Sequence, residues 1–313
     1  MPSRGWAALC FAAAWVGCAP SKLPPPPSGP PPLNEPALVL PADLDLVLRL
    51  DLTRLRAALG IDADALLRKL SESAPSDEPD ADTSRTLLAL LAHAETLWIA
   101  VRPGLSAELT DGVIALRGDF RNVIPSSLGG VPRWSHARDL GGGLLRFERE
   151  PPRMRAAPAV MYLRLPDVVV VGSEAEVDAL ERSVEAGNAD AALRAPESGL
   201  IAAAARLGSL RRRLAERAPT LSRYVEGAER LEGSFDRQGE LFKLRVDVRF
   251  ETADQVTTLA TELKRLQESV RAEGHAWVDH FAFEPLQENL AVRLELRPDE
   301  LAMLVRCFSK SGC

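Results

Sequence analysis

The chain has 313 residues, of which 46% are hydrophobic and 26% charged, with a formal net charge of −6 at pH 7. These proportions are typical of a soluble globular protein that is long enough for a sizeable core. The mild acidic excess argues against a nucleic-acid-binding protein, which would carry a basic patch or stripe.

The chain begins with a short apolar leader. Arg4 is followed by an uncharged run from Gly5 to Gly17. This run has the length of a secretory leader, whereas a membrane span needs about 20 apolar residues. It ends in Trp15-Val16-Gly17-Cys18. The small residue before the cysteine resembles the lipobox of type II bacterial lipoproteins, with Trp15 standing where leucine is usual.

The resemblance implies that residues 1–17 are removed and that Cys18 is acylated and anchors the mature chain to a membrane. Ala19, in place of an inner-membrane aspartate signal, favours the outer membrane over the inner one. The alternative is an ordinary secretory leader that is cleaved near the same place.

Residues 18–36 then form a proline-rich tether, with nine prolines between Pro20 and Pro36. Consecutive prolines favour polyproline II, which would hold the folded part about 50 Å from the bilayer. A ligand for a proline-binding groove is the alternative. At the other end, Cys307 and Cys313 are close enough in sequence for a disulfide in an oxidising compartment, or for a buried and a free cysteine.

The first half of the folded region alternates strands with helices. Strict alternation predicts a strand over 43–52, and helices are expected over 53–59, from 62 to about 70, and over 85–95. Further strands are predicted over 97–102, 112–119, 144–148, 159–165 and 168–171, with 131–140 as a loop and Gly141-Gly142-Gly143 as a flexible connection. Ser173 and Glu176 match a capping box for a helix that ends near Gly187.

The second half repeats this order. A strand over 199–205, or a helix because of its alanines, precedes a helix over 207–217. A hairpin of strands 231–236 and 240–250 turns at 237–239, and Thr252 with Gln255 predicts a capped helix that ends at Gly274. Strands over 277–283 and 290–296 and a last helix from Pro298 complete the pattern.

The predicted fold class is therefore α+β, with largely antiparallel sheets that helices cover on one face. Residues 37–195 and 196–313 are predicted to be two similar α+β halves, which suggests an internal duplication. The layout is similar to that of uncharacterised exported bacterial proteins, and this similarity carries over no functional residues.

No residue pattern indicates a catalytic, cofactor or metal site. His93 is interpreted as a partly buried structural residue. His136 is interpreted as a loop side chain on the surface, or as a ligand contact together with Trp134. His275 and His280 are separated by an odd number of strand positions, which places them on opposite faces. Asp43, Asp45 and Asp51 could bind a cation together, although Arg49 between them favours salt bridges. The cluster Arg211-Arg212-Arg213 with Arg217 is interpreted as a solvated helix face, or as a contact for anionic lipid.

The favoured hypothesis is a lipid-anchored envelope protein without catalytic activity that binds or scaffolds a periplasmic or cell-surface partner. One alternative is a hydrolase or transferase with a nonstandard site among loops 103–111 and 131–143. Another is an apolar-ligand carrier, which requires an unfilled cavity between helix 253–273 and its sheet. No cofactor and no nucleic-acid partner are predicted.

Overall fold

The computed structural model describes most of the region after the predicted tether. The described ranges are 36–62, 88–103, 110–121, 134–150, 158–164, 166–186, 193–208, 224–274 and 276–300, with a few isolated positions between them. The N-terminal leader, Cys18, the tether up to residue 35, Cys307 and Cys313 lie outside the described residues. Within the described part of the chain, no helix is long and apolar enough to cross a membrane.

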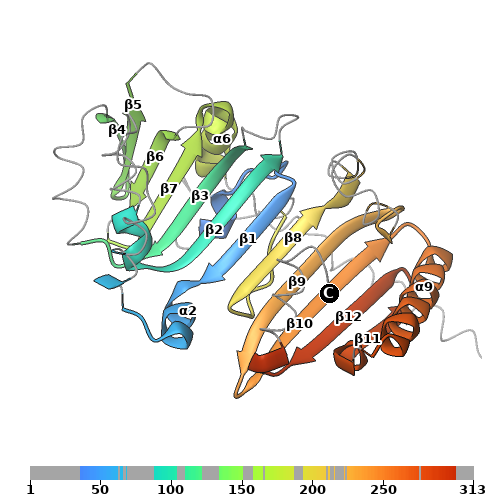
Figure 1. Cartoon of the computed structure of the whole chain (residues 1–313). Helices are drawn as coiled ribbons and strands as arrows, with labels where there is room; N and C mark the ends of the chain where they lie inside the picture. The colour runs from blue at the N-terminus through green and yellow to red at the C-terminus, as the bar shows by residue number, and fades with distance from the viewer. Residues whose placement is uncertain are drawn as a thin grey trace, which may run out of the picture.

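One antiparallel sheet of twelve strands forms the framework, in the order β11-β12-β10-β9-β8-β1-β2-β3-β7-β6-β5-β4 (Figure 1). The strands are β1 (Leu46–Asp51), β2 (Ala94–Pro103), β3 (Thr110–Gly118), β4 (Trp134–Gly141), β5 (Leu144–Arg149), β6 (Pro158–Arg164), β7 (Val168–Ser173), β8 (Ile201–Arg206), β9 (Ala228–Gln238), β10 (Leu241–Phe250), β11 (Phe281–Leu286) and β12 (Asn289–Leu296). The sheet is continuous across the predicted boundary at residues 195 and 196, because β1 pairs with β8.

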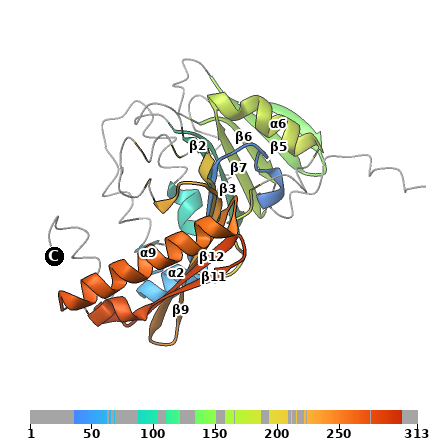
Figure 2. The same cartoon turned by 90° about the vertical axis from the view of Figure 1, so that its right-hand side faces the viewer.

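Helices pack on both faces of this sheet. They are η1 (Pro36–Val39), α2 (Leu52–Leu59), η2 (Glu174–Glu176), α6 (Val177–Ala186), α9 (Ala253–Ala272) and η3 (Ala276–His280), and residues 88–93 are also helical. Figure 2 shows α9 against β11 and β12, away from α6 at the other end of the sheet.

Alternate residues of the strands define the two faces. On the α6 face, Val47, Ala100 and Tyr162 form a core with side chains of η1 and α6. On the opposite face, which we call the α9 face, Leu50 and Leu97 pack with α2. Leu46, which shares the side of Leu50, packs with the α9 core. The expectation that helices cover one face only is therefore wrong for the first half of the sheet, where β2, β3, β6 and β7 contribute buried apolar residues to both faces.

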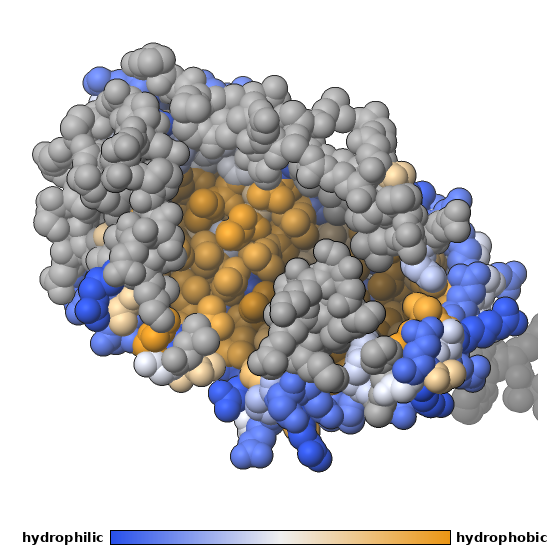
Figure 3. All heavy atoms as spheres, viewed as in Figure 1, coloured by the Kyte–Doolittle hydropathy of each residue, from blue (hydrophilic) through white to orange (hydrophobic). Residues whose placement is uncertain are grey.

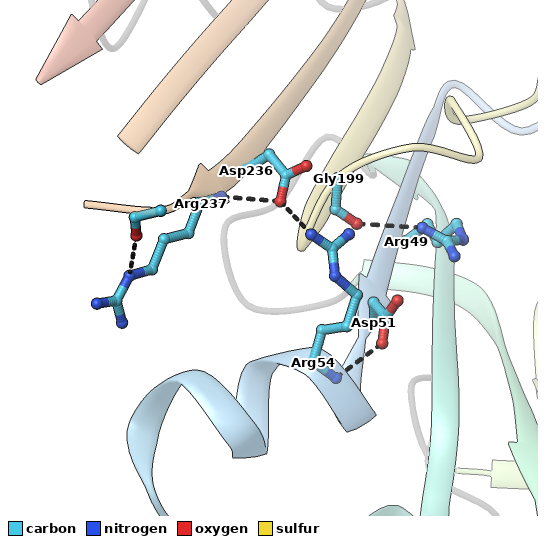
Figure 4. Close-up of polar contacts among 7 residues, drawn as sticks. Arg49, Asp51, Arg54, Gly199, Asp236 and Arg237 are labelled. Atoms are coloured by element: carbon cyan, nitrogen blue, oxygen red, sulfur yellow. Dashed lines mark hydrogen bonds and ion pairs between the residues drawn. The ribbon is translucent and has the colours of Figure 1, made fainter. Parts of the chain in front are cut away.

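Polar contacts from β1 and α2 reinforce the central junction (Figure 4). The Asp51 side chain caps α2 by accepting a hydrogen bond from the Arg54 amide at 3.0 Å. The Arg54 guanidinium pairs with Asp236 of β9 at 2.6 Å, and Arg49 donates to the Gly199 carbonyl at 3.4 Å. These contacts join segments far apart in the sequence to the same end of the β1–β8 pair.

Several local predictions are confirmed. Thr252 and Gln255 form both hydrogen bonds of the capping box that begins α9. In β10, Val248 and Phe250 are buried, while Arg245 and Arg249 on the other side are exposed. Gly141, Gly142 and Gly143 all have positive φ and connect β4 to β5, which explains the run of glycines.

Three local predictions are wrong. Residues 134–141 form β4 instead of a loop, and residues 276–280 form η3 instead of the start of a strand. Ser173 makes no side-chain capping bond. Its hydroxyl accepts a hydrogen bond from the Gly112 amide at 3.1 Å, and Glu176 pairs with Arg102. Both side chains of the expected capping box therefore bond to residues that are distant in the sequence.

The α6 face supplies a pH-dependent prediction. Tyr162 is only 1% exposed, and burial raises its pKa to about 12, an effect that the charge of Arg146 partly offsets. An unfolded tyrosine ionises near pH 10, so between about pH 10 and 12 the unfolded chain releases a proton that the folded chain retains. Folding stability must then fall as the pH rises through this window.

We expect the wild type to lose up to about 2–3 kcal/mol more stability than Tyr162→Phe between about pH 10 and 12. Below about pH 9 the difference between the two proteins should stay constant, because the phenol is neutral in both states. Urea unfolding over this pH range measures the effect. Parallel pH profiles of the two proteins would contradict it.

Candidate functional site

The long helix α9 carries an apolar stripe that the sheet buries at one end only. Its spacing, at Val256, Leu259, Leu263, Leu266 and Val270, places these side chains on one side of the helix. Val256 and Leu259 are buried in a core with β10 and β12. Leu263 and Val270 are half-buried, and Leu266 is 46% exposed.

A cavity of about 320 Å³ lies beneath this less buried half of α9. Its lining residues come from α9, η3, β11 and β12, and they are Leu263, Leu266, Gln267, Val270, Trp277, Val278, Phe281, Phe283 and Val292. Eight of these nine residues are aliphatic or aromatic. The volume is in the range of small-molecule sites.

The aromatic side chains of the cavity form a connected group. The rings of Trp277 and Phe281 are 6.0 Å apart in a tilted arrangement, and Phe281 stacks with Phe283 at 6.0 Å. These spacings are favourable for aromatic pairs, so each ring holds the next in position. All three rings line the cavity opposite the α9 side chains.

Gln267 is the single polar side chain of the lining. Its Nε2 group donates hydrogen bonds to the carbonyl oxygens of Val278 at 2.6 Å and Phe281 at 3.1 Å. The amide nitrogen is therefore used to fasten η3 and β11 to α9. The cavity wall consequently favours a ligand group that needs no hydrogen bonds.

The rest of the α9 face is also apolar across the centre of the sheet. One cross-strand row carries apolar or small residues on eight successive strands: Val292, Val246, Gly233, Ala203, Leu48, Ile99, Ile114 and Val171. Leu48, Ile99 and Ile114 are half-buried. Figure 3 shows the resulting apolar surface over the region where Figure 1 places β1 to β3.

The residues singled out in the sequence for polar chemistry do not converge. His93 is exposed, which corrects its interpretation as partly buried. His280 pairs with Glu300 at 3.1 Å, while the side chain of His136 and the whole of His275 lie outside the described part. No group of three or more metal-ligating side chains gathers among the described residues.

Two of the three aspartates near β1 have separate side-chain partners. Asp43 pairs with Arg102 at 2.7 Å, and Asp51 caps α2. Arg49 contacts the Gly199 carbonyl, not a neighbouring aspartate. Arg211 donates to the Ala228 carbonyl at 2.9 Å and lies 3.6 Å from Glu251, whereas Arg212, Arg213 and Arg217 lie outside the described residues.

Sequence reasoning named helix 253–273 as the place where an apolar-ligand carrier needs a cavity, and the structure has one there. It did not identify the lining residues. The available signal was the length of the apolar stripe, which extends past the point where Val256 and Leu259 meet the sheet. The aromatic group at Trp277, Phe281 and Phe283 was assigned to an uninterrupted strand, so its place in the cavity wall was missed.

Comparison with known proteins shows a distant similarity of overall structure only. No family model matches the sequence, and no curated protein is similar to it. Three solved structures of the protein TP0453, in crystal forms I, III and IV, cover 87% of this chain, and 96–97% of their own chains is covered. Their identity is 9–10% and their TM-scores are 0.45, 0.47 and 0.49. At this level the similarity assigns no function and no site.

Proposed function

We propose that this protein is a lipid-anchored envelope protein that binds the hydrocarbon chain of a lipid without catalysis. The cavity under α9 carries the proposal, because its lining is apolar and the amide nitrogen of its one polar side chain already donates to backbone carbonyls. A peptide placed in it would bring backbone N–H and C=O groups that find no partners, which is costly. A hydrocarbon chain brings no such groups.

The anchor part of the proposal rests on the sequence. Gly17-Cys18 follows an apolar run of leader length, and the proline-rich segment 18–36 would hold the folded region away from the bilayer. An acylated Cys18 would tether the binding site to a membrane, the outer membrane in preference to the inner one. A membrane is also the natural source of hydrocarbon chains.

We also infer that residues 37–195 and 196–313 derive from one duplicated unit. Counting outward from the central β1–β8 pair, the strand orders are β1-β2-β3-β7-β6 and β8-β9-β10-β12-β11. Both series reverse the sequence order of their last two strands at the same place. The strands β4 and β5 are then additions to the first half, and the antiparallel β1–β8 pair relates the halves by an approximate twofold axis.

Filling the cavity tests the proposed ligand. Val270→Trp adds bulk to the lining from α9, and Glu268→Trp is a matched control, because Glu268 is an exposed residue of the same helix. With a photoreactive long-chain fatty acid, we expect cross-links in the wild type within residues 263–292. Val270→Trp should reduce this labelling at least tenfold, about 1.4 kcal/mol, while Glu268→Trp leaves it unchanged.

The proposal would be overturned by a folded wild-type protein that gives no cross-link in this segment. Equal labelling of Val270→Trp and wild type would also overturn it, because the added indole occupies the space that the chain needs. Circular dichroism of each variant establishes that α9 is still folded.

The anchor has a separate test. Cys18→Ser should yield a protein that takes up no labelled palmitate in bacteria and stays in the soluble fraction, because the serine hydroxyl does not replace the thiol. The control is Cys10→Ser, which changes a cysteine within the leader and should leave acylation intact. Recovery of acylated Cys18→Ser protein would disprove the anchor.

A further inference from the structure

A second apolar recess lies on the α9 face, in the first half of the sheet. Its volume is about 310 Å³, close to that of the α9 cavity. Its lining residues belong to β2, β3, β6 and β7, and they are Ile99, Val101, Gly112, Val113, Ile114, Pro158, Val171, Gly172 and Ser173.

The recess exists because two small residues follow Val101 in its cross-strand row. Val101 pairs with Gly112, and the Gly112 amide donates to the Ser173 hydroxyl at 3.1 Å, so these two positions are adjacent. Gly112 has no side chain, and its backbone packs so closely that a Cβ atom would lie 2.5 Å from the Ala100 carbonyl oxygen. Larger apolar residues in the next row, Ile99, Ile114 and Val171, form the wall.

The side-chain hydroxyl of Ser173, the polar side-chain group of this recess, also has a hydrogen-bond partner. Ser173 is 6% exposed, and its hydroxyl accepts the Gly112 hydrogen bond. The remaining lining side chains are aliphatic or proline. The recess therefore matches the α9 cavity in volume, in chemistry and in the face of the sheet that it occupies.

The approximate twofold axis between the halves relates the position of this recess to that of the α9 cavity. In the two strand series, β7 corresponds to β12 and β6 to β11. Val171 of β7 lines the second recess and Val292 of β12 lines the first, and both lie in the same cross-strand row. The two recesses therefore share the equivalent strand pairs β6–β7 and β11–β12, while α9 and η3 complete the first and β2 and β3 complete the second.

We propose that this recess, lined by Val101, Ile114 and Val171, is a second hydrocarbon-chain site. This inference rests on the proposed function, because it assigns the same ligand class to both places. Seven strand spacings separate Val292 from Val171, about 34 Å along the sheet. The two chains of one membrane lipid share a headgroup and lie side by side in a leaflet about 15 Å deep. Because the chains of one lipid lie side by side, we expect the two sites to hold chains from two separate molecules.

The experiment measures how many long-chain fatty acid molecules the full-length Cys18→Ser protein binds, by native mass spectrometry, and where the photoreactive analogue cross-links. We expect two molecules per chain, with labelling of peptides from 263–292 and from 99–114 or 171–173. Ile114→Trp should remove one molecule and the second set of labels, whereas Val270→Trp should remove the other molecule. The control Arg117→Trp adds an indole at an exposed position of the same strand on the opposite face and should keep both.

The outcomes separate the two proposals. One bound molecule that Val270→Trp abolishes overturns the second site and leaves the proposed function intact. No bound molecule overturns both. Two molecules that survive in both Ile114→Trp and Val101→Trp, with no label in 99–114 or 171–173, place the second chain elsewhere and overturn this assignment. The second variant ensures that a folding defect in either one does not decide the result.

Discussion

Arg102→Met is expected to destabilise the protein by about 3–5 kcal/mol, because it leaves the buried Glu176 carboxylate without its charge partner. Glu176 is 1% exposed. The Arg102 guanidinium meets it with two nitrogens, Nε to Oε1 at 3.0 Å and a terminal nitrogen to Oε2 at 3.5 Å. The hydrogen bond to Glu176 is the largest cause that holds the pKa of Arg102 far above its ordinary value. Urea unfolding of the variant measures the loss.

Two further variants test whether the burial of Glu176 causes this loss of stability. Asp43 also pairs with Arg102, at 2.7 Å, but its side chain is 65% exposed, so Asp43→Asn should cost no more than about 1 kcal/mol. The double variant Arg102→Met with Glu176→Leu should recover most of the stability, since no charge then remains buried. A cost for Arg102→Met no greater than that for Asp43→Asn would disprove the role of burial.

Phe250→Ala is expected to cost about 3–5 kcal/mol and to loosen α9 from the sheet. Phe250 is 2% exposed at the end of β10 and belongs to the core that holds Val256, Leu259 and Ala260 of α9. Removing the ring leaves a cavity where the helix begins. Since that contact positions the cavity lining further along α9, the variant should also lose fatty-acid labelling within 263–292.

The matched control is Phe242→Ala, on the same strand and the same face. Phe242 is half-buried and stacks on Phe235 at 5.5 Å, so its loss should cost less, about 1–2 kcal/mol. Chemical denaturation compares the two variants, and cross-linking shows whether α9 keeps its ligand. Equal destabilisation by both substitutions would contradict the stated role of Phe250.

Local sequence patterns predicted the elements that have one solvent-exposed side and one buried side. In β10, Arg245 and Arg249 alternate with Val246, Val248 and Phe250, and this alternation is that of a strand buried on one face. The capping box at Thr252 predicted the start of α9, because both of its hydrogen bonds are local. The strand β4 has no such alternation, since within the described residues it is an edge strand that pairs only with β5, and it was therefore missed.

Local patterns gave wrong predictions where a side chain bonds to a residue that is distant in the sequence. Ser173 and Glu176 have the spacing of a capping box, but Gly112 and Arg102 bind them instead. The candidate site shows the same limit. Trp277 and Leu266 belong to different elements, and only the tertiary packing of α9, η3 and β11 brings them into one cavity wall, where Gln267 bonds to both η3 and β11.

The sequence by itself determined the α+β class, the antiparallel strands and the amphipathic helix α9, because hydrophobic periodicity and caps act over a few residues. It also supplied the cell-envelope location that we propose from Trp15-Val16-Gly17-Cys18. Only the tertiary structure decided that all the described strands form one sheet, because the β1–β8 pair joins residues about 150 positions apart. That pairing creates a shared α9 face and places two apolar recesses on it, which no local pattern specifies.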